Sequence, residues 1–251
     1  MVSSISDGAR LMRASFDLVR RRRRLLLFPA MSTACLAVTA GFWIYEGAWL
    51  YAIDSAWFLY VPVVVLGLYS LTVVGIFFNV ALAGAAADAI DGSKPSLGDA
   101  INVAWLRFGA IATWAAYAVF VSLVLGLVKS VRGLRWAGTA AQIAWNFATI
   151  FVVPLIALEG EGASSARKHS FSLAKENWRA ESGGLGALRV ALIVPMLLFY
   201  VDFRVLASGH VHSFAGRALL GAILLAGFGV AVAASVVRQV FAVELYRAAK
   251  T

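Results

Sequence analysis

Five long stretches of the chain contain no Asp, Glu, Lys or Arg and are rich in apolar side chains. They lie between Arg24 and Glu46, Asp54 and Asp88, Arg107 and Lys129, Arg135 and Glu159, and Arg217 and Arg238. A helix of about 20 apolar residues crosses the roughly 30 Å hydrocarbon core of a bilayer. The pattern therefore predicts a transmembrane helix in each stretch.

A sixth, shorter stretch runs between Arg189 and Asp202. At ~1.5 Å per residue it covers roughly 20 Å, so Arg189 would snorkel inward and Asp202 would lie at the outer interface. We predict a span here, and the alternative is a re-entrant or interfacial segment broken near Pro195. The first stretch also resembles a cleavable signal peptide, but it continues through Trp43 and Tyr45, which favours a retained helix.

The composition agrees with a membrane protein, because 61% of the residues are hydrophobic and 14% are charged. Soluble domains carry roughly 25% charged residues. We predict an all-α fold, a polytopic bundle of about six transmembrane helices, with residues 1–251 forming a single membrane domain. The net charge of +9 does not indicate nucleic acid, since the cations lie beside apolar stretches and no recognition motif is present.

Lys and Arg are distributed unequally between the two sides of the predicted bundle. Of the 22 cations, 17 lie on the side of the N-terminus and five on the other side. Loops that are rich in Lys and Arg stay in the cytoplasm. We therefore predict that both termini are cytoplasmic.

One sequence pattern recurs at the predicted cytoplasmic ends of the second, fourth and last spans. Residues 78–82, 151–155 and 241–245 each read Phe-x-Val-x-Leu, and acidic residues follow or overlap each of them. Ahead of the first and fifth spans, residues 15–20 also resemble residues 170–175, while the middle counterpart leading to Trp105 is looser.

This periodicity predicts a threefold repeat. Its units are residues 1–91, 92–161 and 162–251, each a cytoplasmic interfacial amphipathic helix followed by a transmembrane hairpin. The alternative is chance, since Phe, Val and Leu are common in this chain. If the repeat is real, each repeated phenylalanine packs on the amphipathic helix of its own unit. The expected pairs are Phe78 with Phe16, Phe151 with Trp105, and Phe241 with Phe171.

Two basic segments are candidates for binding anionic lipid headgroups or a protein partner. The first is the run Arg20, Arg21, Arg22, Arg23 and Arg24. The second is a predicted interfacial helix over residues 164–179, with the candidate residues Arg167, Lys168, Lys175, Trp178 and Arg179. Each basic residue near an anionic leaflet contributes about 1 kcal/mol. The alternatives are a plain topology anchor for the first segment and simple membrane adhesion for the second.

Three polar residues lie within predicted spans: Asn79, Gln142 and Asn146. Such residues hydrogen-bond between helices or line a conduit for a solute. The predicted midplanes carry no ionisable residue, which argues against an ion-coupled pump. The sequence contains no recognisable catalytic constellation, cofactor motif or metal-binding spacing, so we expect a protein that is not an enzyme and needs no cofactor or metal.

Several of these segments carry a family resemblance. They are Leu25-Leu26-Leu27-Phe28-Pro29, residues 78–82, residues 149–154, Ser170-Phe171-x-Leu173, Asn177-Trp178 and residues 240–249. Together they resemble, over nearly the whole chain, an uncharacterised family of bacterial and archaeal six-helix membrane proteins known only as a domain of unknown function. A looser likeness is to the membrane domain attached to some glycerophosphodiester phosphodiesterases. The resemblance implies six helices in a bacterial inner membrane, but no activity and no functional residues.

The sequence favours a non-enzymatic membrane scaffold or accessory subunit that binds anionic lipid or partner proteins, or a second copy of itself, at the cytoplasmic face. The alternative is a permease or channel for a small solute, with Asn79, Gln142 and Asn146 lining its path.

We predict that Cys35 lies in lipid or packed protein, because it is about ten residues into the first span. A membrane-impermeant thiol reagent should leave it unlabelled in intact cells. Rapid labelling would show that the first apolar stretch does not cross the membrane.

Overall fold

The computed structural model describes residues 5–177, 186, 197, 200, 201, 204, 205 and 214–250, and these residues form helices and no strands. The elements are α1 (Ile5–Arg21), η1 (Arg23–Leu26), α2 (Leu27–Ala52), η2 (Trp57–Leu59), α3 (Tyr60–Ile90), α4 (Leu97–Leu106), α5 (Phe108–Ser130), α6 (Arg135–Ala148), α7 (Val152–Pro154), the π-helix η3 (Leu155–Glu159), a helix over residues 163–177, and α9 (Phe214–Lys250). The all-α prediction is confirmed.

Five segments of the described chain are long and apolar enough to cross a membrane. They are Arg23–Ala52, Trp57–Ile90, Phe108–Ser130, Arg135–Glu159 and Leu220–Lys250. These correspond to the five long stretches in the sequence, so the chain is a multi-pass membrane protein. The shorter predicted span between Arg189 and Asp202 lies largely outside the described residues.

The long helices are tightly packed at one end only. In α3, all the buried residues except Gly67 lie between Ile76 and Ala89. Among the α9 side chains that the structure describes, the buried ones begin at Val236. Towards the other end, large apolar side chains such as Trp49 and Leu66 are exposed, as expected where lipid rather than protein surrounds a helix. We call residues 76–90, 150–159 and 236–250 together the packed end.

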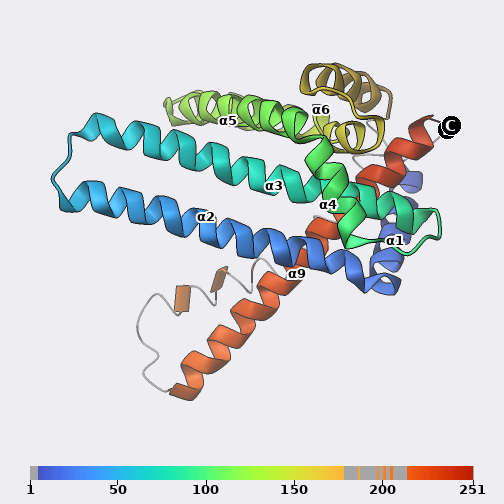
Figure 1. Ribbon diagram of the computed structural model, residues 1–251, viewed down its shortest axis with the longest axis horizontal. Helices are drawn as coiled ribbons and strands as arrows, with labels where there is room; N and C mark the ends of the chain where they lie inside the picture. Colours follow the sequence, from blue (N-terminus) through green and yellow to red (C-terminus); the bar gives the residue numbers. More distant parts are fainter. Residues whose placement is uncertain are drawn as a thin grey trace.

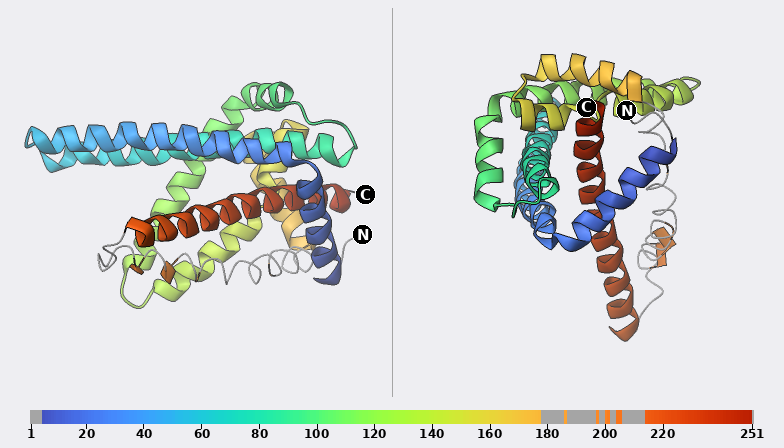
Figure 2. Two further views of the ribbon diagram at one scale, coloured as in Figure 1. Left: turned by 90° about the horizontal axis from the view of Figure 1, so that it is seen from below. Right: turned by 90° about the vertical axis from the view of Figure 1, so that its right-hand side faces the viewer.

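The helices at the packed end run across the long ones. Figure 1 shows α2 and α3 extending side by side in one direction, while α4 and α1 cross this direction near the C-terminus. Figure 2 shows the same crossing of α1 from two further sides. α1 packs against α9, and α4 packs against α3. The crossing helices therefore cover the ends of the long helices.

The predicted pairing of each repeated phenylalanine with its own unit is wrong. α1 contacts α9 of the third unit, α4 contacts α3 of the first, and the helix over residues 163–177 contacts residues 148 and 151 of the second. α4 and the helix over residues 163–177 thus each cover the long segment that precedes them in the chain. α1, which has no preceding long helix in the described chain, covers the last one, α9. The three aromatic residues expected in these contacts, Phe16, Trp105 and Phe171, are exposed.

The reason lies in the register of the crossing helices. Each exposed aromatic residue directly follows a fully buried small residue, and these small residues are Ser15, Ala104 and Ser170. Successive side chains on a helix point about 100° apart, because it has 3.6 residues per turn. A small side chain on the inner face allows close approach of the two backbones and turns the following aromatic ring outward.

The predicted fourth span is not one continuous helix. α6 ends at Ala148, a turn covers residues 149–151, and the chain continues as α7 and η3. Pro154 explains the break, because proline has no N–H and its ring crowds the carbonyl four residues earlier, here that of Ile150. The π-helix ends at Gly160, whose φ of +68° suits glycine.

The hairpin of α2 and α3 depends on a close approach at Gly67. The indole N–H of Trp43 donates a hydrogen bond of 2.7 Å to Ser70 Oγ. A Cβ at Gly67 would lie 3.3 Å from the Trp43 ring, whereas a Cβ at Gly75 in the same helix would meet nothing within 4 Å.

Gly67→Leu should therefore destabilise the protein by about 1–3 kcal/mol, as is typical for overpacking. Gly75→Leu is the matched control, with a branched side chain added to an open surface of the same helix. Thermal unfolding in detergent, followed by circular dichroism, measures the difference. Equal melting temperatures for the two variants would contradict this contact.

Candidate functional site at the packed end

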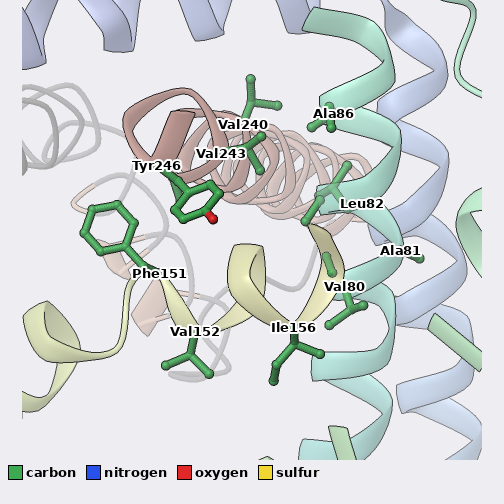
Figure 3. Packing of buried hydrophobic residues seen from close by; sticks show 14 of the residues in the cluster. Val80, Ala81, Leu82, Ala86, Phe151, Val152, Ile156, Val240, Val243 and Tyr246 are labelled. Carbon is green, nitrogen blue, oxygen red and sulfur yellow. The ribbon is translucent and has the colours of Figure 1, made fainter. Parts of the chain in front are cut away.

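The core of the packed end brings together the three repeated segments. The residues Phe78, Phe151 and Phe241 are all buried, as are Leu82, Leu155 and Leu245. Figure 3 shows side chains of α3, α7, η3 and α9 meeting in one cluster, with the ring of Phe151 near that of Tyr246. The three segments therefore form one shared core, although they are far apart in the sequence.

Acidic residues at the rim of this core are held by the end of α9. Arg247 donates two hydrogen bonds to Asp91, of 2.5 and 2.9 Å, which join α9 to the end of α3. The hydrogen bond from Arg247 holds the pKa of Asp91 below its ordinary value. The carboxylate therefore stays charged, and the ion pair intact, until the pH falls below that lowered pKa.

Glu159 receives two further contacts from α9. Tyr246 Oη and Lys250 Nζ each lie 2.6 Å from Glu159 Oε1. Glu159, Tyr246, Lys250, Arg247 and Leu158 line an open depression of about 500 Å³. Its cations are already paired with carboxylates, so the arrangement fixes the ends of η3 and α3 on α9.

A buried serine connects α1 to α9. Ser15 Oγ lies 2.6 Å from Glu244 Oε2 and 2.9 Å from the carbonyl of Leu11. Ser15 is fully buried. Glu244 is partly buried, and its carboxyl group needs hydrogen bonds to offset the hydration that it loses, so this contact makes the position of α1 specific.

A second buried serine forms hydrogen bonds with backbone groups at the break in the fourth span. Ser170 Oγ donates a 2.7 Å hydrogen bond to the carbonyl of Ala148 and accepts one of 3.2 Å from the backbone N–H of Phe151. Backbone groups that a helix break leaves unpaired must find partners where water is excluded. Ser15 and Ser170, which the sequence analysis placed at equivalent positions, therefore both make buried polar contacts with a neighbouring long helix. These contacts were not predicted from the sequence.

The predicted arginine run lies at the junction of α1 and α2. Arg20, Arg21, Arg23 and Arg24 are exposed, and Arg22 donates a 3.1 Å hydrogen bond to the carbonyl of Gly92. Leu25 and Phe28, which follow the run, are buried in the core. The exposed guanidinium groups are therefore attached to a backbone that is firmly anchored.

The second predicted basic segment is only partly described. Lys168 and Lys175 are exposed, and the guanidinium of Arg167 lies 5.2 Å from the ring centre of Tyr117 on α5. Trp178 and Arg179 lie outside the described residues. The structure places the helix over residues 163–177 beside the break in the fourth span.

The three candidate conduit residues do not come together. Gln142 Nε2 donates a 3.2 Å hydrogen bond to Asn146 Oδ1 one turn along α6, and Lys129 Nζ lies 3.4 Å from Gln142 Oε1. Asn79 is exposed on α3 and takes no part in these bonds. Gln142 and Asn146 bond to each other because residues four apart share one face of a helix. The role of the three residues in lining a conduit stays a prediction, and these hydrogen bonds do not support it.

The model of a family of unknown function, DUF6159, matches residues 58–251. The chain belongs to this family. The match includes α3 to α9 and starts beyond α1 and α2. This agrees with the resemblance to an uncharacterised family, while the likeness to the phosphodiesterase membrane domain stays a prediction. No curated protein and no solved structure matches the chain. Among the described residues no group of three or more His, Cys, Asp or Glu side chains could hold a metal ion.

Ser170→Ala should destabilise this member of the family by about 1–3 kcal/mol, because it leaves two buried backbone groups without a partner. Ser172→Ala is the control, since Ser172 is exposed and bonds only within its own helix, to the carbonyl of His169. Thermal unfolding in detergent provides the comparison. A Ser170→Ala protein that is as stable as Ser172→Ala would show that the break needs no repair.

Proposed function

We propose that the protein is a non-enzymatic scaffold or accessory subunit of the bacterial plasma membrane, with both termini and the packed end in the cytoplasm. In this proposal the arginine run at the junction of α1 and α2, beside the packed end, binds anionic lipid headgroups. The observation that supports it most is the group of four exposed arginines, Arg20, Arg21, Arg23 and Arg24. Within the described part of the chain, none of the four has a carboxylate in an ion pair.

The contrast with the cations Arg247 and Lys250 of the packed end supports this assignment. Arg247 and Lys250 are neutralised by Asp91 and Glu159, whereas the arginine run keeps its charge for an external anion. Each basic residue near an anionic leaflet contributes about 1 kcal/mol. Four such residues would therefore give several kcal/mol of preference for anionic lipid over neutral lipid, without any lipid-shaped pocket.

The absence of an enzymatic role is inferred from how the titratable groups are used. The carboxylates of Asp91, Glu159 and Glu244 are each bonded to a side chain of another helix. A general acid or base needs access to a substrate proton. Groups engaged in holding helices together favour a structural role for this end of the bundle.

A permease for a small solute is the second candidate, and the break at residues 149–151 favours it. Discontinuous membrane helices line substrate sites in many transporters. Here, however, Ile150, Phe151 and Val152 are buried, and Ser170 already bonds the backbone groups at the break. The scaffold therefore accounts better for the geometry. Solute flux into proteoliposomes would favour the permease.

Replacing Arg23 and Arg24 by Gln should reduce the enrichment of phosphatidylglycerol over phosphatidylcholine around the purified protein several-fold. The double variant Arg132→Gln with Arg135→Gln is the matched control, since both arginines are exposed and carry the same charge. They lie between the C-terminal end of α5 and the start of α6, at the end of α5 that is opposite to α4. Lipids that co-purify from mixed bilayers, quantified by mass spectrometry, provide the measurement. Equal enrichment of phosphatidylglycerol in the two double variants would contradict headgroup binding by the arginine run. A protein that co-purifies with the unchanged chain but not with the Arg23 and Arg24 variant would indicate a protein partner in place of lipid.

A further inference from the structure

The three crossing helices each expose one aromatic side chain, and each of these directly follows a fully buried small residue. Ser15, Ala104 and Ser170 are each 0% exposed, and the residues that follow them, Phe16, Trp105 and Phe171, are 57%, 61% and 60% exposed. Large aromatic rings rarely face water without a reason, because each buries a large apolar area when covered. Three such rings on three separate helices indicate a common environment.

The height of Trp105 along the bundle identifies that environment. Its ring packs edge-on against Phe77 at 5.3 Å between centroids, and it lies tilted against the ring of Phe108 at 5.5 Å. Phe77 lies 20 residues after Trp57, where the second candidate span begins. At ~1.5 Å per residue this distance is about 30 Å, the thickness of the hydrocarbon core. Trp105 therefore lies where the apolar core of the bilayer ends, the level at which membrane proteins concentrate Trp and Tyr.

The other two aromatic residues lie at similar levels. Ser170, before Phe171, bonds the backbone of Phe151, which corresponds to Phe78 in the repeated pattern. Ser15, before Phe16, bonds Glu244, three residues beyond the corresponding Phe241. Three residues of helix are about 5 Å, which is within the depth of the headgroup region.

Charge on the same faces is complementary to a lipid surface. Arg20 follows Phe16 by four residues, and Lys175 follows Phe171 by four residues; both cations are exposed. Residues four apart lie on one face of a helix. Apolar rings next to outward-facing cations are the pattern of helices that lie in the headgroup layer, whereas a protein interface core is depleted of Lys.

We propose that Phe16, Trp105 and Phe171 insert into the headgroup–acyl boundary of the cytoplasmic leaflet and form a three-point anchor around the bundle. The anchor fixes the depth and tilt of the packed end, so that the crossing helices lie in the membrane surface. The proposal rests on the proposed placement of this end at the cytoplasmic membrane surface. It does not need the arginine run to prefer anionic lipid.

The test uses nitroxide spin labels on the full chain in phosphatidylcholine–phosphatidylglycerol vesicles. In a Cys35→Ala background, Phe16→Cys, Trp105→Cys and Phe171→Cys are labelled one at a time. The control labels are at Asp17→Cys, Asp99→Cys and Ser172→Cys, which are exposed positions on the same three helices. Collision with oxygen, which concentrates in lipid, is compared with collision with a water-soluble nickel chelate.

At the three aromatic positions the ratio of oxygen to nickel collisions should exceed that of the controls several-fold. Ratios equal to those of the controls would show that the rings face water and overturn the proposal. Protection from both reagents would show a protein contact, from a second copy or a partner, and would overturn it as well. The outcome is separable from headgroup preference, because a high ratio in pure phosphatidylcholine supports the anchor even if phosphatidylglycerol is not enriched by the arginine run.

Discussion

The structure depends on a mismatch between the length of its helices and the thickness of a bilayer. α3 has 31 residues and α9 has 37, which at ~1.5 Å per residue is about 46 and 55 Å. The hydrocarbon core requires only about 20 residues. The remaining turns extend beyond the length that a bilayer requires, and they combine apolar residues with charged ones such as Asp88, Glu244 and Arg247. They are stabilised by packing on one another, and this packing is the core at the packed end.

The sequence of α3 shows how this core is built. Between Ala81 and Ala89 most positions are alanine, and nearly all of them are buried. Small side chains let helices approach closely, so that backbone contacts and dispersion replace bulky interdigitation. α4 and α9 pack on this surface, while Phe151, Phe241 and Leu155 fill the centre. Hydrogen bonds and ion pairs occupy the rim, where Asp91 and Glu159 meet Arg247 and Lys250.

Hydropathy was sufficient to predict the five long spans, because lipid solvation is a local property that each segment satisfies by itself. It could not predict which long helix each crossing helix covers, since that choice depends on contacts between distant residues. Ser15 and Ser170 carried the signal, as polar residues in matching positions, but only the positions of Glu244 and Ala148 show what they bind. Pro154 was a sequence signal for a break in the fourth span. The signal was not used, because the apolar residues around Pro154 continue without interruption.

Only part of the candidate site could be predicted from the sequence, because some of its features are local and others depend on contacts between distant residues. The arginine run could be predicted from the sequence alone, because a run of charged side chains is exposed whatever the fold around it. Gln142 and Asn146 could not be interpreted correctly without coordinates, since pairing within one helix and lining a shared path require the same residue types. The acidic residues after each repeated segment were visible, but their partners at the end of α9 depend on the fold.

The division of α3 into a lipid-facing part and a packed end outside the bilayer is the central claim, and paired cysteine accessibility tests it most directly. Leu66 and Asp91 are both exposed, so geometry alone would make cysteines at the two positions similarly reactive. In a Cys35→Ala protein reconstituted in vesicles and opened to reagent on both sides, a water-soluble maleimide should label Asp91→Cys and leave Leu66→Cys unlabelled. Equal labelling of both positions, or labelling of Leu66→Cys alone, would contradict this division.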